Sequence, residues 1–188
     1  MKFLVDATNP STDALKCLIT AQFTGVKITP TTPINTAKGE HKKPDFQQKS
    51  PLGHLPVLEI DNHTYLTNAN VICRYLCSKN DKVLLIGSDF NGSLVDQWLE
   101  LESTLSTDVL LQKLNTHLDK QENKKRVVGD RSAITLADIV LWSTLYRALS
   151  SKFENNQRAN FPVAAQWFDD ILADHDKFFN QALSFSQL

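Results

Sequence analysis

Few residues near the end of the first predicted strand could act as nucleophiles. Ser11 follows the first predicted strand, and the three cysteines are Cys17, Cys73 and Cys77. Ser11 stands directly before a segment with helical spacing, where serine is a favoured N-cap because its hydroxyl accepts a hydrogen bond from an early backbone N–H group. Cys17 falls on the apolar face of that helix, which predicts a buried and inert thiol. The residue types therefore indicate no catalytic residue.

Candidate metal ligands are equally sparse. Cys73 and Cys77 stand one helical turn apart, but a zinc site needs two further ligands at fixed spacing and the sequence offers none. Asp174-His175-Asp176 connects two predicted helices and is interpreted as solvated caps. We expect no metal and no cofactor. The odd number of cysteines argues against a disulfide framework and predicts a reducing, cytoplasmic location.

Composition excludes several classes of function. The chain has 188 residues and a formal net charge of -1, whereas proteins that bind nucleic acids or membrane surfaces normally carry a basic patch. No apolar run is long enough to span a bilayer, and Asp6 comes too early for a signal peptide. The length allows one compact unit or two small domains.

The first half of the chain alternates strands and helices. Ser11 begins a helix that Gly25 ends, and the segment between residues 29 and 51, rich in Pro, Thr and Lys, is predicted to be a loop with at most one short helix, anchored by Phe46 and Leu52. Asn68 is a good N-cap for a later helix. The predicted strands are residues 2–6, 26–28, 57–60 and 65–66.

The second half is helical throughout, and its most specific signal is a helix start. Thr135 with Asp138 three residues later predicts a capping box, and Ile134 with Ile139 predicts the hydrophobic staple around it. Each device contributes about 1 kcal/mol to helix stability. We therefore interpret Asp138 as structural rather than as a catalytic acid. Pro162 marks the start of a later helix.

The stretch Gly53-His54-Leu55-Pro56-Val57-Leu58, with the helix that carries Ile72-Cys73-Arg74-Tyr75, resembles the thioredoxin-like domain of the glutathione transferase fold. The resemblance implies a fold of class α/β + all-α. A thioredoxin-like β-α-β-(α)-β-β-α domain would occupy residues 1–79, a linker residues 80–92, and a compact helical bundle residues 93–188. It also implies a cis peptide bond before Pro56, whose loop presents main-chain groups to glutathione in that family.

The same resemblance shows what this sequence lacks. Catalytic relatives carry an acidic residue and a serine that help to bind the γ-glutamyl carboxylate of glutathione at a helix N-terminus, and these positions read Asn68-Ala69 here. No Tyr or Cys stands between Lys2 and Asn9 to stabilise the glutathione thiolate. We therefore expect a vestigial glutathione site, formed by Ser11, Leu55, Pro56, Asn68 and Ala69.

Four segments resemble the non-catalytic domain appended to eukaryotic aminoacyl-tRNA synthetases. They are Asn9-Pro10 with Ala14-Leu15-Lys16, Tyr65-Leu66 leading to Ile72-Cys73-Arg74-Tyr75, Asp96-Gln97-Trp98-Leu99-Glu100, and Leu136-Ala137-Asp138-Ile139-Val140-Leu141-Trp142. Methionyl-tRNA synthetase is favoured, and the glutamyl-prolyl enzyme, the small auxiliary protein of the multisynthetase complex and elongation factor one gamma are alternatives. The resemblance implies a domain of a longer protein that does not itself aminoacylate.

That resemblance implies docking by pairing with other domains of this fold in a multisynthetase complex, as a heterodimer, or with itself as a homodimer. The expected partner interface is Asn70, Arg74 and Tyr75, and Arg and Tyr are favoured interface residues. Several relatives use a second face with an arginine before a tryptophan, but Gln166 precedes Trp167 here, so the first face is preferred. The competing hypothesis is a glutathione-dependent transferase that uses Ser11 and the Pro56 loop.

A basic run offers an accessory role. Lys124-Lys125-Arg126, Arg131 and the loop lysines could contact tRNA, and such binding would be weak and sensitive to salt. A solvated helix end is the simpler interpretation of the same residues. We expect no association with membranes.

Overall fold

The computed structural model describes residues 1–9, 11–80, 83–122, 124–129 and 133–186. The chain divides into two compact units, one formed by residues 1–81 with 180–188 and the other by residues 82–179. The segment predicted as a linker, residues 80–92, contains the short helix α4 (Val83–Ile86) and the start of α5 (Asp89–Thr104). The predicted domain boundaries therefore stay a proposal.

A four-stranded mixed sheet forms the centre of the first unit, with the strand order β2-β1-β3-β4. Strand β1 (Lys2–Asp6) pairs in parallel with β2 (Thr29–Ile34) and antiparallel with β3 (Val57–Asp61). Strand β3 pairs antiparallel with β4 (Thr64–Thr67) across a tight turn. Three of the four predicted strands are thus confirmed near their predicted positions.

The second strand lies further along the chain than predicted. The structure places it at Thr29–Ile34, inside the segment that the sequence predicts as a loop, and not at residues 26–28. The reason is its position at the edge of the sheet, where only β1 pairs with it. An edge strand tolerates Pro30 and Pro33 because the missing N–H groups can fall on the open side.

The segment after β2 contains a short 3-10 helix (Glu40–Lys42) and the helix α2 (Pro44–Gln47). Phe46 is buried against Leu4 and Val57, so its predicted anchoring role is confirmed. The same prediction for Leu52 is wrong, since this side chain is 79% exposed. Leu52 lies in a turn that the Gly53 N–H closes by donating to the Ser50 carbonyl at 2.8 Å, and this turn faces solvent.

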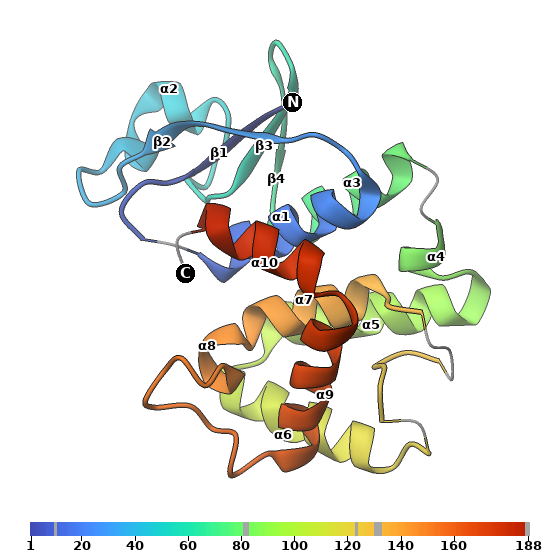
Figure 1. Cartoon of the computed structure of the whole chain (residues 1–188). Helices are drawn as coiled ribbons and strands as arrows, with labels where there is room; N and C mark the ends of the chain where they lie inside the picture. The colour runs from blue at the N-terminus through green and yellow to red at the C-terminus, as the bar shows by residue number, and fades with distance from the viewer. Residues whose placement is uncertain (10, 81–82, 123, 130–132, 187–188) are drawn as a thin grey trace. The chain divides into compact units, whose positions relative to one another are not determined.

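Helices α1 (Thr12–Thr24) and α3 (Ala69–Lys79) pack side by side against the sheet (Figure 1). Helix α1 begins and ends as predicted. The Ser11 hydroxyl accepts a hydrogen bond from the Asp13 N–H at 3.1 Å. Gly25 adopts the left-handed conformation, with φ of 69°, which glycine tolerates best.

The second unit is helical. Beside α4 and α5, it contains α6 (Thr107–Asp119), α7 (Leu136–Thr144), α8 (Tyr146–Leu149), α9 (Pro162–Asp174) and the start of α10 (Asp176–Ser186). Helix α7 is buried over eight consecutive residues from Leu136 to Ser143 and packs against α5 and α9. Trp142 on α7 stacks on Phe168 of α9, with ring centroids 4.5 Å apart. Within the described residues, no helix has the length and hydropathy that crossing a membrane requires.

Candidate functional site

Two of the three segments of the expected glutathione site meet at one end of the sheet. Leu4 of β1 lies opposite Val57 of β3, and Val57 lies opposite Thr67 of β4. Pro56 directly precedes β3 and Asn68 directly follows β4. The strand register therefore brings both residues to the same end of the sheet. The Leu55–Pro56 peptide bond is cis, as the resemblance implies.

Asn68 caps helix α3, which begins at this end of the sheet. Its side-chain Oδ1 accepts hydrogen bonds from the N–H groups of Asn70 at 2.9 Å and Val71 at 3.3 Å. Early N–H groups of a helix are the donors that bind an anion at a helix N-terminus. In this chain two of those donors already bind the neutral side-chain amide of Asn68. The N-cap role predicted for Asn68 is confirmed.

The other residues of the expected site also have structural partners. The Ser11 hydroxyl caps α1, Leu55 packs against the cluster of Leu4, Phe46 and Val57, and Ala69 is buried with no hydroxyl to offer. The polar side chains of Ser11 and Asn68 thus stabilise helix ends. That these residues form a vestigial glutathione site stays a prediction.

Helix α3 presents two different faces. Ile72, Cys73, Leu76 and Cys77 are fully buried. The opposite side carries the expected interface residues Asn70, Arg74 and Tyr75, all half-buried, together with Val71, which is 48% exposed. The Lys79 ammonium lies 5.6 Å from the centre of the Tyr75 ring. This face combines aromatic, cationic and apolar groups, a combination that is common in protein interfaces.

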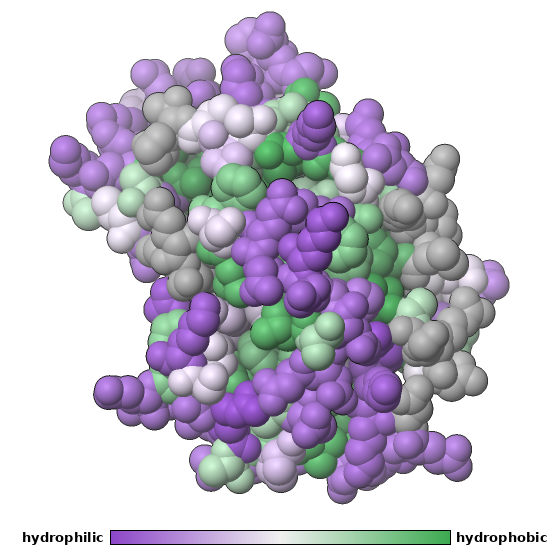
Figure 2. All heavy atoms as spheres, in the orientation of Figure 1, coloured by the Kyte–Doolittle hydropathy of each residue, from purple (hydrophilic) through white to green (hydrophobic). Residues whose placement is uncertain are grey.

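Figure 2 shows a surface that is largely hydrophilic on the face turned to the viewer, with apolar residues between the polar ones. Large apolar side chains that are exposed within the described residues are Leu52, Val71, Phe90, Val109 and Phe185. Val71 is the member of this group that shares a helix face with the expected interface.

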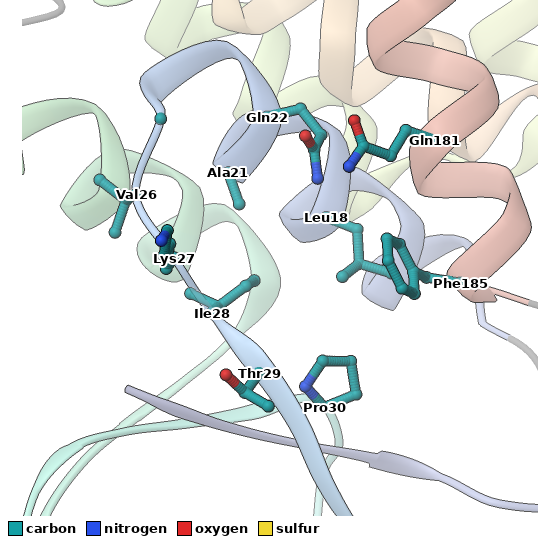
Figure 3. Close-up of a pocket in the computed structure, with 11 residues that line it drawn as sticks. Leu18, Ala21, Gln22, Val26, Lys27, Ile28, Thr29, Pro30, Gln181 and Phe185 are labelled. Atoms are coloured by element: carbon teal, nitrogen blue, oxygen red, sulfur yellow. The ribbon is translucent and has the colours of Figure 1, made fainter.

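A separate pocket of about 400 Å³ lies between α1, the start of β2 and the end of α10 (Figure 3). Leu18 and Phe185 form part of its apolar wall, and the side chains of Gln22 and Gln181 point toward one another. None of the residues expected to bind glutathione lines this pocket. The two features are therefore distinct.

The face around Trp167 differs from what the resemblance describes. Trp167 is fully buried, and a hollow of about 440 Å³ beside it is lined by Lys124, Lys125, Gln166 and Asp170, among others. The Gln166 amide donates to the Asp170 carboxylate at 2.9 Å within its own helix. Gln166 thus makes a contact within its own helix.

The interpretation of the basic run as a solvated helix end is wrong for Arg126. This guanidinium is only 3% exposed and binds the Asp174 carboxylate at 3.0 Å. The sequence did not reveal the pair because its members are 48 residues apart. Lys124 binds Asp119 at 2.7 Å, and Arg131 lies outside the described residues. Two of the cations proposed for tRNA are therefore engaged in ion pairs.

The Arg126–Asp174 pair predicts a loss of stability in acid. The hydrogen bond from Arg126 holds the pKa of Asp174 below its ordinary value of 3.8, with smaller contributions from His175 and Lys125. The unfolded chain therefore binds more protons in this range, and the contribution of the carboxylate to stability disappears as the pH falls through its lowered pKa. We expect Asp174→Asn to flatten the decline of the unfolding free energy between about pH 5 and pH 3, measured by urea denaturation.

At neutral pH the same substitution should cost about 0.5–1 kcal/mol, since Asp174 is partly exposed and solvent screens the pair. Asp170→Asn is the matched control, because Asp170 lies on the same helix and accepts from an amide. An identical pH slope in the wild type and Asp174→Asn would contradict the prediction.

The predicted capping box is present at the start of α7. The Thr135 N–H and hydroxyl both donate to Asp138 Oδ2, at 2.9 and 2.8 Å. The other oxygen of Asp138 accepts from the Val127 N–H at 2.8 Å and from the Trp167 indole at 3.3 Å. These last two contacts tie the preceding loop and α9 to the helix start. Asp138 is fully buried, which fits a structural role.

Comparisons with known proteins agree with this geometry. A family model described as "Glutathione S-transferase, N-terminal domain" matches residues 10–79. A probable glutathione S-transferase of Oryza sativa subsp. japonica, GSTF2, is 42% identical over 79 residues, which is 42% of this chain and 36% of the relative. Elongation factor 1-gamma 3 of the same species is 27% identical over 197 residues, covering 89% of this chain and 46% of the relative.

The cytoplasmic methionine–tRNA ligase of Mus musculus is 34% identical over 118 residues, covering 50% of this chain and 12% of the ligase. The chain thus spans less than half the length of these three relatives. A solved structure of the glutathione transferase URE2P6 from Phanerochaete chrysosporium superposes with a TM-score of 0.78 over 99% of this chain and 96% of that chain, at 20% identity. The chain has a glutathione transferase-like fold, with a mixed four-stranded sheet in its N-terminal domain and a helical C-terminal domain.

Proposed function

We propose that this chain is a non-catalytic docking domain of a translation protein, which pairs with other domains of glutathione transferase-like fold. The observation that carries the proposal is the extent of the alignments. The elongation factor alignment covers 89% of the chain, whereas the transferase alignment covers 42%. The similarity to translation proteins therefore includes the helical half of the chain as well as the sheet.

The parent protein is either elongation factor one gamma or methionyl-tRNA synthetase. The ligase alignment is more identical but covers half of the chain, so the wider alignment now favours the elongation factor over the synthetase that the sequence motifs favoured. The location that these relatives imply is cytoplasmic. Accessory tRNA binding would rest on the exposed lysines, because Arg126 is buried in an ion pair.

The local chemistry supports docking over catalysis. Asn68 fills two donors at the start of α3 with its own side chain, and Ala69 has no hydroxyl. On the same helix, Arg74 and Tyr75 lie on the side opposite the buried residues. We propose this face, with Asn70, as the partner interface.

One experiment tests the docking face. The chain is mixed with the purified glutathione transferase-like domain of an elongation factor one gamma or of a methionyl-tRNA synthetase, and assembly is measured by sedimentation velocity. We expect a heterodimer, or a homodimer of the chain alone, that Arg74→Glu weakens at least about tenfold, since an interfacial charge reversal costs more than about 1.4 kcal/mol.

The matched control is Lys38→Glu, which makes the same charge change on an exposed loop residue away from α3. Equal assembly of Arg74→Glu and the wild type, with both folded by circular dichroism, would exclude this face. Failure of the chain to pair with either domain or with itself would exclude the docking function.

A glutathione-dependent transferase is the second candidate, favoured by the match of residues 10–79 to the transferase family model. The cis peptide before Pro56 and the Ser11 hydroxyl are the features it would use. Calorimetric titration with glutathione, beside a conjugation assay, distinguishes the two functions. We expect neither heat of binding nor turnover. Micromolar binding with turnover that Ser11→Ala removes would make the chain an enzyme.

A further inference from the structure

Two thiols from different helices lie side by side in the core of the first unit. The sulfur atoms of Cys17 on α1 and Cys73 on α3 are 3.9 Å apart, and both residues are completely buried. The Cys73 thiol donates to Cys17 Sγ, and the Cys17 thiol donates to the Ala69 carbonyl at 3.6 Å. The residues are 56 positions apart, so the sequence predicted an inert thiol at Cys17 without placing it beside Cys73.

We propose that Cys17 and Cys73 form an oxidation site, at which a hydroperoxide converts the two thiols into a disulfide that joins α1 to α3. A disulfide bond is about 2.05 Å long. The sulfur atoms therefore need to approach by roughly 2 Å for the bond to form. Because neither thiol is exposed, the oxidant must be small, and hydrogen peroxide is close to water in size.

A buried cation supports reactivity at this position. Lys16 is 1% exposed and its ammonium binds the Asp13 carboxylate at 2.8 Å. Burial raises the pKa of Cys17. Burial also acts to raise the pKa of Cys73. Once Cys73 is ionised, however, its sulfur accepts hydrogen bonds from Cys17 and Thr20, and these bonds together with the charge of Lys16 outweigh burial and lower that pKa. Cys73 is therefore the thiol that attacks, since the thiolate is the reactive form.

The reaction balances with one peroxide per pair. The Cys73 thiolate attacks one peroxide oxygen, the O–O bond breaks, and the departing hydroxide takes up the proton that Cys73 lost to become water. The resulting sulfenic acid is attacked by the sulfur of Cys17. The S–S bond forms as the S–O bond breaks, and the second hydroxide leaves as water with the Cys17 proton. Each sulfur atom is oxidised by one electron, and the peroxide is reduced by two.

The chain contains its own control. Cys77 lies one turn after Cys73 on the same buried face of α3. Burial raises the pKa of Cys77 to about 12, so its thiol stays protonated. If oxidation followed only from being a buried cysteine of α3, Cys77 would react as readily as Cys73. The proposal predicts that it does not.

The test uses the purified chain treated with hydrogen peroxide, then unfolded and alkylated before intact-mass and peptide mass spectrometry. We expect the monomer to lose two hydrogens, to retain one alkylatable thiol at Cys77, and to yield a cross-linked peptide that joins Cys17 to Cys73. Cys77→Ser should form the same cross-link. Cys73→Ser and Cys73→Ala should not, and two variants of different polarity guard against misfolding of one.

Several results would overturn the proposal. Three alkylatable thiols after treatment of the folded wild type would show that the pair does not close. A cross-link through Cys77 would show that the wrong pair was chosen. A disulfide between two chains would show that oxidation follows unfolding rather than the geometry of the core.

Discussion

Asp138→Ala is expected to lower the free energy of unfolding by about 3–5 kcal/mol. The carboxylate is fully buried and accepts hydrogen bonds from Val127, from Thr135 and from the indole of Trp167. Alanine removes both oxygens and leaves these donors without acceptors in the core, and each such donor costs about 1–3 kcal/mol before the structure relaxes. Urea denaturation followed by circular dichroism measures the effect.

Two further variants show whether the loss of stability comes from the buried hydrogen bonds of Asp138 or from removing an acidic residue in the first turn of a helix. Asp138→Asn keeps the volume and one acceptor oxygen but turns an NH₂ group toward the donors of the other oxygen, so it should cost less than alanine and more than about 1 kcal/mol. Asp108→Ala removes an exposed carboxylate from the first turn of α6 and should cost less than about 1 kcal/mol. If Asp138→Ala were no more destabilising than Asp108→Ala, Asp138 would not organise the helical unit.

Signals that act over a few residues predicted the structure well. Ser11, Gly25, Asn68 and the Thr135 capping box all mark helix ends at the positions where the structure has them. Each of these residues satisfies backbone groups of its immediate neighbours, so its role depends little on the rest of the fold.

Interactions between distant segments were not predictable in this way. Thr29–Ile34 forms a strand because β1 is available beside it, although its prolines disfavour one. Arg126 belongs to a basic run in the sequence, yet in the structure its side chain is buried and paired with Asp174. The sequence predicted an ordinary buried thiol at Cys17, and only the packing of α1 on α3 brings Cys73 to within 3.9 Å of it. In all three cases the partner lies far away in sequence.

The second large effect on stability is expected at Trp142, in the aromatic cluster of the second unit. Trp142 is fully buried. Its ring stacks on Phe168 at 4.5 Å with an interplanar angle of 3°, and it meets Phe179 edge-on at 4.4 Å. The indole N–H donates to the Phe168 carbonyl at 3.0 Å. One side chain thus connects α7 with α9 and with the start of α10.

Trp142→Ala is therefore expected to lower the free energy of unfolding by about 3–5 kcal/mol, since it leaves a large cavity and removes the aromatic contacts. Trp142→Phe keeps the stacking but not the hydrogen bond, and should cost about 1–2 kcal/mol. Phe90→Ala is the control, because Phe90 is 74% exposed and its loss should change stability by less than about 0.5 kcal/mol. Urea denaturation compares the three. Equal losses for Trp142→Ala and Phe90→Ala would mean that this centre does not stabilise the helical unit.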